Sequence, residues 1–599
     1  MRWRAIWLTL ALAGAAATQP RTCSCGADPP GRPPERTIVP YGAVPPDLRP
    51  FSRFTEPYYE HYTKEVEYNG AARSVPTLKP SDVAEVAIGF LGPIHEHKDE
   101  ALGLAMLRGA EMAVDEANAG GGYGGKLFAL KVHNDAALWG ASSNEIVKMI
   151  YDEKVWAMLG SISGDSTHIA LRVSLRAELP MVNSAATDPT IPETAIPWIL
   201  TAIQDDRVQS YTLARRIYSE LGLRRIALLR VNERYGRFGV VKFRDASRRL
   251  EHPVVVEQKF TPGDTDFTRQ LRVIQDSGVD GIVLWTDPAP AGMILKQMRE
   301  LGMEQRVFGA ARVVGADLFR IAGNAAEGLE VVYPFDPNRD EPGWLAFQKR
   351  FVARYAAGVD SFAALGYDTM NILLDAICRA GLNRGAIRDA LYGLERYKGV
   401  TGEMIFDPNA KNIAPLYLGI VKEGKFTFRR YTMEKPYAEL KEQPVAYEGP
   451  PAKDMQAPEQ TIGVFGPQAD RVAATLRHGG YRFVGVPSET AWGKSSTELV
   501  KLVYEQNAIG LIATDRAAAH LAEQIAVKTF VPVIALSADR KLTTTNIPWI
   551  FRLEPGTPIE EAAGYFIEAA GRAGPNRGRI REDLASGRFN ANGELRGGP

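Results

Sequence analysis

The stretches VAEVAIGFLG, residues 83–92, and ALGLAMLRGAEMAVDEAN, residues 101–118, decide the fold of this chain. The first is a short apolar run with branched side chains, which predicts a buried strand. The second repeats its apolar residues at helical spacing, and the glycines at 120–122 predict where that helix ends in a turn. A strand followed by a helix is the repeating unit of parallel sheets.

Strand and helix patterns continue to alternate beyond this unit. Further strands are expected at 126–133, 155–160, 179–183, 225–231, 253–259, 280–285 and 306–309, and helices at 142–152, 166–177, 209–221, 236–249, 266–277, 290–301, 342–356 and 365–380. Short strands are expected within 400–431. This alternation predicts an α/β fold built on doubly wound parallel sheets.

Length and composition narrow the class of protein. A chain of 599 residues is expected to hold about two to four domains. With 45% apolar and 24% charged residues, its composition is that of a soluble globular protein. The 71 basic residues are balanced by 71 acidic ones, and this zero net charge gives no support for nucleic-acid binding, which usually needs a basic face.

The N-terminus has the pattern of a signal peptide at 1–17. Arg2 and Arg4 precede an uncharged, mostly apolar run at 5–17, which ends in three alanines. The run is too short to span a bilayer comfortably, and no later segment resembles a membrane helix. We therefore expect export to the periplasm or the cell exterior, with cleavage after about Ala17. An uncleaved anchor or a buried helix remains the alternative reading.

Residues 18–80 form a proline- and tyrosine-rich extension, where proline density excludes regular elements over much of the length. Two of the three cysteines of the chain, Cys23 and Cys25, lie in it. The Arg-Thr pair before Cys23 does not match a lipoprotein acylation signal, so membrane tethering is left open. Cys378 lies on a helical pattern and is expected to be a packed core thiol.

Two 13-residue segments nearly repeat each other. WGASSNEIVKMIY (139–151) and WGKSSTELVKLVY (492–504) are identical at eight positions. In the same order, IGFLGP (88–93) recurs as IGVFGP (462–467), and RAGLNRGAIRDAL (379–391) recurs as RAGPNRGRIREDL (572–584). Repeats of this kind indicate a duplicated structural unit.

The spacing of the repeats predicts the domain organisation. Trp198 and Arg379 are 181 residues apart but their counterparts Trp549 and Arg572 only 23, so about 158 residues, roughly 206–365, are absent from the second copy. A block that can be removed so cleanly is expected to be a domain inserted into another domain. The expected parts are a bilobed module at 83–431 (lobe one 83–205 and about 340–431, lobe two about 206–339), a linker at 432–459 and a degenerate single-lobe repeat at 460–599.

Several short motifs, in this order and spacing, resemble one family. They are IGFLGP (88–93), GAEMAVDEAN (109–118), SAATDP (184–189), Tyr235-Gly236, AEG (326–328) and GYD (366–368). On them, residues 83–431 resemble the branched-chain amino-acid (leucine-type) receptor family of ABC importers. The resemblance implies the bilobed type I periplasmic-binding-protein fold, with a ligand held between two closing lobes.

The resemblance also implies ligand-binding residues in lobe one. In the family, the ligand carboxylate is held by hydroxyl groups and backbone N–H groups near helix N-termini, where the helix dipole favours an anion. The matching positions here are Ser163, Gly164, Ala185 and Thr187. Gly164 replaces a usual serine, so one hydroxyl contact is lost. Helix capping is the alternative role for Ser163 and Thr187.

In lobe two, the resemblance places Tyr235 over the ligand, although a turn aromatic in the lobe core is the alternative. The family usually has an acidic residue after strand 306–309, whereas this chain has Arg312 there. Arginine prefers a carboxylate or phosphate partner, which makes a simple α-amino acid ligand doubtful. Asp287, after strand 280–285, is a candidate for the missing negative charge, and an ordinary loop aspartate is equally compatible with the sequence.

His95 and His97 lie in a loop that borders the cleft in this family. A His-x-His pair needs further ligands to bind a metal, and the sequence identifies none, so a role for His95 at the rim of the site is preferred. We therefore predict no metal and no cofactor.

The predicted function is that of an extracytoplasmic solute-binding protein without enzymatic activity. It captures a small organic ligand (an amino acid, amide or carboxylate) and delivers it to an ABC permease and ATPase. A receptor that senses a ligand without transport uses the same module and is the main alternative. An exported α/β hydrolase is disfavoured, because Ile162 occupies the position of the nucleophilic serine in GSISG (160–164).

Overall fold

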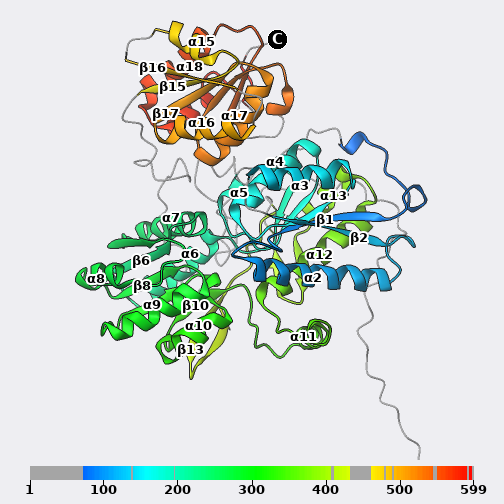
Figure 1. Ribbon diagram of the computed structural model, residues 1–599, viewed down its shortest axis with the longest axis vertical. Helices are drawn as coiled ribbons and strands as arrows, with labels where there is room; N and C mark the ends of the chain where they lie inside the picture. The colour runs from blue at the N-terminus through cyan, green and yellow to red at the C-terminus, as the bar shows by residue number, and fades with distance from the viewer. Residues whose placement is uncertain are drawn as a thin grey trace, which may run out of the picture.

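Figure 1 shows the computed structural model, in which the described residues form three α/β units. The structure describes residues 72–135, 139–193, 196–406, 410–431, 460–477, 480–488, 492–543, 549–589 and 593–596. The predicted signal peptide, the extension up to residue 71, both of its cysteines and the predicted linker lie outside the described residues. The expected α/β class with parallel sheets is confirmed.

Lobe one is built on a five-stranded parallel sheet in the order β2-β1-β3-β4-β5. Its strands are β1 (Val86–Gly92), β2 (Phe128–Asn134), β3 (Met158–Gly160), β4 (Met181–Asn183) and β5 (Ile199–Thr201). Every residue of β1 is buried, because helices cover both faces of the sheet. Alternate residues of β1 accordingly enter two different cores, Ala87 and Leu91 on one side and Ile88 and Phe90 on the other.

The helices of lobe one divide between these two cores. The helices are α2 (Glu100–Ala119), α3 (Trp139–Tyr151), α4 (Gly164–Ala177), α5 (Thr190–Glu193), α12 (Ser361–Ala380) and α13 (Arg384–Tyr392). Helices α2 and α12 pack closely, since a Cβ on Gly109 would lie 2.0 Å from the backbone oxygen of Ala363, and one on Gly366 would lie 2.3 Å from that of Met106. Glycine is therefore required at both positions of this crossing.

Lobe two contains a seven-stranded sheet in the order β14-β13-β10-β9-β8-β6-β7. Its strands are β6 (Ile226–Val231), β7 (Val256–Phe260), β8 (Gly281–Trp285), β9 (Arg306–Gly309), β10 (Glu330–Tyr333), β13 (Tyr417–Lys422) and β14 (Lys425–Arg430). Its helices are α6 (Asp206–Ala214), α7 (Arg234–Arg249), α8 (Thr268–Asp276), α9 (Pro288–Glu300) and α10 (Ala316–Ala322). Helix α6 continues as a π-helical turn over 215–220.

One predicted boundary is wrong. The whole of 340–431 was assigned to lobe one, but β13 and β14 belong to the sheet of lobe two. Strand β13 pairs antiparallel with β10, and β14 pairs antiparallel with β13. Strand patterns carry no information on pairing partners, so the return of the chain to lobe two could not be seen in the sequence. Helix α11 (Pro342–Tyr355) and the hairpin β11 (Arg396–Gly399) and β12 (Gly402–Ile405) complete the module.

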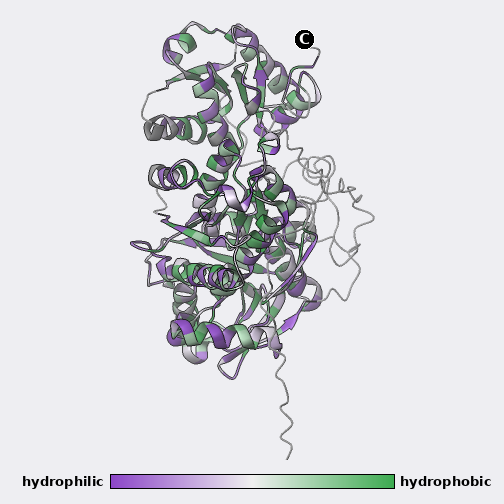
Figure 2. Ribbon diagram, turned by 90° about the vertical axis from the view of Figure 1, so that its right-hand side faces the viewer, coloured by the Kyte–Doolittle hydropathy of each residue, from purple (hydrophilic) through white to green (hydrophobic). Residues whose placement is uncertain are grey.

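The C-terminal unit, residues 460–599, has a five-stranded parallel sheet in the order β16-β15-β17-β18-β19. Its strands are β15 (Thr461–Gly466), β16 (Arg482–Pro487), β17 (Ala508–Ala513), β18 (Val533–Leu536) and β19 (Ile550–Leu553), and its helices are α15 (Ala469–Thr475), α16 (Trp492–Tyr504), α17 (Arg516–Thr529), α18 (Ile559–Ala573) and α19 (Arg577–Ser586). Hydrophobic residues concentrate on the strands and on the inner helix faces (Figure 2). Each unit is therefore a sheet covered by helices on both faces.

The cysteine expectation also needs correction. Cys378, in α12, is disulfide-bonded and is not a free core thiol. The other two cysteines of the chain lie outside the described residues. Disulfides persist in oxidising compartments, which fits the export that the N-terminus predicts.

Candidate ligand-binding site

The residues that the sequence singled out gather where the strands of the two lobes end. Ser163 and Gly164 follow β3, Thr187 follows β4, and Asp287 and Arg312 follow β8 and β9. All of these strands are parallel within their sheets, so their carboxyl ends lie at one edge of each lobe. Ligands of open α/β sheets bind at this edge, next to the point where the strand order reverses.

Several ion pairs join the two lobes at this edge, including one of 3.9 Å between Arg234 Nε and Asp165 Oδ1. Arg234 of α7 donates from Nε to Asp188 Oδ2 at 2.5 Å. Arg312 Nη2 lies 3.2 Å from Asp99 Oδ1, and Lys98 pairs with Glu233. Each pair takes one residue from lobe one and one from lobe two, so the lobes are closed on each other in this structure.

The N-terminus of α4 is shaped by the Gly164 substitution. Ser163 caps the helix, and its hydroxyl accepts a hydrogen bond from Ser166 N at 3.2 Å. A Cβ on Gly164 would lie 2.4 Å from Asp188 Oδ2 and 2.8 Å from its Cβ. The Asp188 carboxylate therefore occupies the space that a serine side chain at position 164 would need.

Asp188 is held by lobe one as well as by Arg234. Its Oδ1 accepts from the backbone N of Thr190 at 2.9 Å and from the Thr190 hydroxyl at 2.6 Å. The Thr190 hydroxyl also bonds His168 Nε2 at 2.8 Å. Because the side chain of Asp188 is only 5% exposed, this carboxylate is a fixed negative charge at the helix N-terminus.

Arg312 is already neutralised by the protein. Its Nε donates to Asp287 Oδ1 at 2.8 Å, and its guanidinium carbon lies 4.7 Å from the centre of the Tyr235 ring. Burial opposes its charge, but Asp287 and Asp99 outweigh burial and raise the pKa of Arg312 above its usual value. Asp287 therefore pairs with Arg312 and does not offer a free negative charge to a ligand. Arg312, in turn, does not offer an unpaired positive charge to an anion.

Tyr235 contributes a buried hydroxyl to the site. The Tyr235 hydroxyl makes no hydrogen bond of normal geometry to another described residue. Burial, followed by the nearby carboxyl of Asp206, raises the pKa of Tyr235 well above its usual value. The ring lies beside Trp285, with a centroid separation of 6.3 Å. Tyr235 therefore presents a neutral hydroxyl and a π-face.

Asp206, the first residue of α6, is a site residue that sequence reasoning missed. It is fully buried, and its Oδ2 has no hydrogen-bond partner among the described residues. Burial is the main reason why the pKa of Asp206 is raised well above its usual value; a hydrogen bond with Thr187 opposes the shift, and Asp188 adds to it. Its neighbour Asp205 caps α6 and accepts a hydrogen bond from Arg207 N at 3.1 Å.

The remaining predicted residues, His95 and Ala185, lie at the border of the candidate site. His95 is exposed, and its backbone N donates to Asn134 Oδ1 at 3.2 Å. Ala185 is buried in the loop after β4. Across the described ranges, no group of three or more His, Cys, Asp or Glu residues could hold a metal ion. Over the same residues, no helix is both long and apolar enough to cross a bilayer.

Comparison with known proteins identifies the class. The profile of the family described as "Periplasmic binding protein" matches residues 85–425, more than half of the chain. The chain therefore belongs to the periplasmic binding protein family, and its bilobed module is that of a ligand-binding receptor.

Relatives and solved structures agree with this assignment. The chain is 25% identical over 318 residues to an amino acid binding protein of Pseudomonas aeruginosa. The aligned region covers 52% of this chain and 83% of the relative. It is 25% identical over 254 residues to the Leu/Ile/Val-binding protein of Escherichia coli (42% of this chain, 68% of the relative).

Two solved structures share the fold. One is the branched-chain amino acid binding protein LivJ of Streptococcus pneumoniae, solved with isoleucine. It aligns with a TM-score of 0.53 at 24% identity, and the alignment covers 58% of this chain and 100% of the LivJ chain. A solute-binding protein from R. palustris, solved with benzoate, aligns with a TM-score of 0.52 at 19% identity over 58% of this chain and 98% of its own.

Proposed function

We propose that the module of residues 83–431 is an exported solute-binding protein whose ligand carries a protonated amine. The single observation that carries the ligand class is the Asp206 carboxyl, fully buried between Thr187 and Tyr235 with one oxygen unpartnered among the described residues. Buried polar groups are nearly always satisfied, so we take Asp206 Oδ2 as the atom to which the ligand supplies a hydrogen-bond partner.

The charges around Asp206 support a cationic group. The carboxyl groups of Asp99, Asp188, Asp206 and Asp287 surround the guanidinium groups of Arg234 and Arg312. Each guanidinium is already paired with at least one carboxylate, so neither needs a further anion. A ligand that brought only a carboxylate would add a negative charge to this excess, whereas an ammonium group would balance it.

The other predicted residues take roles around this ammonium. We assign the hydroxyls of Ser163 and Thr187 and the backbone N–H groups of Gly164 and Ala185 to polar contacts from lobe one. Tyr235 covers the ligand from lobe two, where a ring face attracts a cation. Arg312 and Asp287 hold Tyr235 and the lobe boundary in place, and His95 stands at the rim.

The family relationship supports an amino acid or amino acid amide as the ligand. The relatives from Pseudomonas aeruginosa and Escherichia coli are named for binding amino acids. An amino acid has both the ammonium that Asp206 requires and a carboxylate suited to the N-terminus of α4. Delivery to an ABC permease and ATPase, without catalysis, follows the same relationship.

A thermal-shift screen of the full chain tests this proposal. The compounds are grouped in sets of three: an amino acid such as leucine, the amine left when its carboxyl is removed (3-methylbutylamine) and the acid left when its amine is removed (4-methylpentanoate). We expect stabilisation of about 2–3 kcal/mol at 100-fold excess over Kd, restricted to the amine-bearing members.

Asp206→Asn should abolish these shifts, and Asp340→Asn, at an exposed position, should leave them unchanged. Stabilisation by the acid alone would overturn the ammonium assignment while leaving a receptor function intact. No shift from any set would count against ligand binding by the module itself.

A further inference from the structure

Residues 460–599 reproduce the architecture of lobe one in detail. The strand order β16-β15-β17-β18-β19 matches β2-β1-β3-β4-β5 position by position. The repeated 13-residue segments form α3 and α16, and the helices that follow, α4 and α17, both have 14 residues. The chain leaves both of these helices through a left-handed residue, Glu178 (φ 49°) and Phe530 (φ 53°).

Equivalent arginines also make one equivalent bond. Arg384, at the start of α13, donates to the backbone oxygens of Val155 and Ala177. Arg577, at the start of α19, donates to the backbone oxygens of Ala508 and Val503. One bond is equivalent, because Val155 and Ala508 both lie where the chain enters the third strand of its unit, whereas the second acceptors, Ala177 and Val503, lie on different helices.

The two units contact each other through their equivalent helices. Apolar residues of α3 and α4 share one buried cluster with those of α16 and α17. The members of this cluster on the four helices are Ile146, Met149 and Ile150; Ile169, Ala170, Leu171 and Leu175; Leu499, Leu502 and Val503; and Ala518, Ala519, Leu521, Ala522, Ile525 and Ala526. In Figure 1, α16 and α17 lie on the side of the C-terminal unit that faces α3 and α4.

The burial of α4 shows the extent of this contact. Residues 166–172 are all buried, and seven consecutive buried residues cover every side of a helix. Helix α3 differs, since Val147 and Tyr151 on its outer face remain exposed at 42% and 62%. Helix α4 is therefore covered by its own sheet, by the neighbouring helices α3, α5 and α7, and by the C-terminal unit.

The contact has the polarity of a twofold interface. Arg176, near the C-terminal end of α4, donates from Nη2 to the backbone oxygen of His520, near the N-terminal end of α17, at 3.0 Å. The C-terminal end of α4 thus lies beside the N-terminal half of α17, which is the antiparallel arrangement that equivalent helices have about a twofold axis. An interface that uses the same patch on both partners is the usual arrangement of a homodimer.

The charges in this interface are not symmetric. Lobe one contributes Arg172 and Arg176, and the C-terminal unit contributes Glu523, whose side chain is only 6% exposed and lies 3.9 Å from Arg176. Burial lowers the pKa of Arg172 to about 9, and Glu523 opposes that shift. The position of α4 that corresponds to Glu523 is Leu171, so a second copy of the module would bring no carboxylate to these arginines.

We propose that residues 460–599 are a built-in partner for lobe one. This C-terminal unit occupies the α3–α4 face of lobe one, as the second subunit of a homodimer would. Glu523 favours binding of this unit over binding of a second chain. The unit fills the apolar face and brings Glu523 to Arg172 and Arg176, whereas a second module would bring no carboxylate there and would set its own two arginines beside them. Such uncompensated charge is an effective means of excluding a wrong partner.

Hydrogen exchange and light scattering on the full chain test this arrangement. The wild type should be monomeric at all concentrations, with α4 amides protected. Glu523→Lys should release the unit, so that α4 amides exchange at least about tenfold faster. Glu560→Lys, an exposed change on α18 of the same unit, is the matched control and should leave α4 protection unchanged.

A charge swap distinguishes loss of docking from simple misfolding. Combining Glu523→Lys with Arg176→Glu should restore most of the protection of α4, because an opposite pair is formed again. Unchanged α4 protection in Glu523→Lys, or protection that appears only when wild-type chains dimerise, would overturn the proposal. If Glu523→Lys does not fold, Glu523→Gln gives the same comparison with a smaller expected change.

Discussion

The Arg234 guanidinium of lobe two meets the Asp188 carboxylate of lobe one, with 2.5 Å between Nε and Oδ2. Both side chains are largely buried, at 11% and 5% exposure. Asp188 also lies against Gly164, at the start of the helix that the C-terminal unit covers. One ion pair thus connects the closed state of the lobes to the site and to α4.

Removing the cation of this pair should open the lobes. Arg234→Gln leaves Asp188 buried without its main partner, and breaking a buried pair in this way costs about 3–5 kcal/mol. We expect a larger radius of gyration by small-angle X-ray scattering and a lower midpoint of thermal unfolding. Arg237→Gln, on the exposed side of the same helix, is the control and should change neither. An unchanged scattering curve for Arg234→Gln would show that other contacts hold the lobes closed.

Restoring the hydroxyl that is usual in the family at position 164 should be harmful in this chain. In Gly164→Ser the new Cβ would lie 2.4 Å from Asp188 Oδ2, so the carboxylate must move and its bond to Arg234 is strained. Overpacking of this kind costs about 1–3 kcal/mol. Chemical denaturation measures the loss.

A second substitution, at Asp188, tests whether its carboxylate causes the loss of stability in Gly164→Ser. Adding Asp188→Ala to Gly164→Ser removes the clash, so the serine should cost less in the Asp188→Ala background than in the wild type. If the two changes are simply additive, Asp188 is not what excludes a side chain from position 164.

Ligand binding at Asp206 should release a proton. Burial raises the pKa of Asp206 well above its usual value in the folded protein, which favours the neutral carboxyl when no ligand is bound. An ammonium ligand favours the ionised form, so the affinity should rise with pH until Asp206 is ionised without ligand. Calorimetry in buffers of different ionisation enthalpy measures the release, and Asp206→Asn should abolish it. Proton uptake on binding would contradict this role.

The sequence predicted most of the scaffold because each element has a local signature. Strand β9 lies where the spacing predicts it, at Arg306–Gly309, and the predicted helix 342–356 is observed as Pro342–Tyr355. Helix α6 begins three residues before the predicted 209, because Asp205 caps it. The placement of β13 and β14 depended on pairing with β10, which no local pattern reveals.

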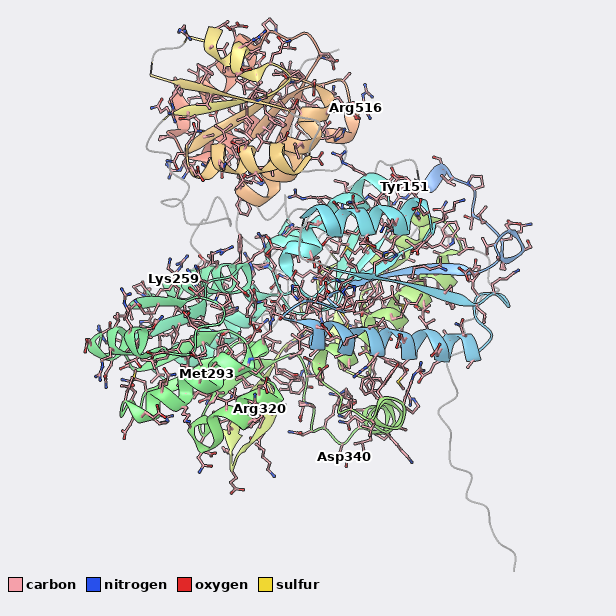
Figure 3. All side chains as sticks on the ribbon, in the orientation of Figure 1. Tyr151, Lys259, Met293, Arg320, Asp340 and Arg516 are labelled. Atoms are coloured by element: carbon pink, nitrogen blue, oxygen red, sulfur yellow. The ribbon has the colours of Figure 1, made fainter. Side chains whose placement is uncertain are left out.

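For the candidate site, the sequence indicated the chain segments involved but not the contacts between them. The connections at the carboxyl ends of strands could be named from the sequence; Thr187 lies in the loop after β4, Tyr235 in the first turn of α7, and Arg312 in a 3-10 turn after β9. The partners of Arg312 could not be named, since Asp99 is 213 residues away and meets it only when the lobes close. The sequence analysis did not single out Asp206, because its burial and its unpartnered oxygen depend on the three-dimensional packing. Figure 3 shows how densely side chains fill each unit, which is the packing that produces such burial.

A separate carboxyl, Asp368 of α12, should make stability depend on pH. It accepts hydrogen bonds from Val400 N and Thr401 N, both at 2.8 Å, and from the Thr401 hydroxyl at 2.6 Å. Burial outweighs these bonds and raises the pKa of Asp368 to about 6. The folded state therefore binds the proton more tightly than the unfolded chain, whose aspartates titrate near 3.9.

The sign of the effect follows from linkage. Between pH 4 and pH 6 the folded state holds more protons, so the contribution of Asp368 to stability falls as the pH rises and levels off above about pH 6. A shift of about two units corresponds to about 3 kcal/mol across this window. Asp368→Asn removes this pH-dependent contribution. As the pH rises from 4 to 7, the unfolding free energy of the wild type, measured by denaturant titration, should therefore fall relative to that of the variant. A difference that is constant over this range would show that Asp368 titrates normally in the folded protein.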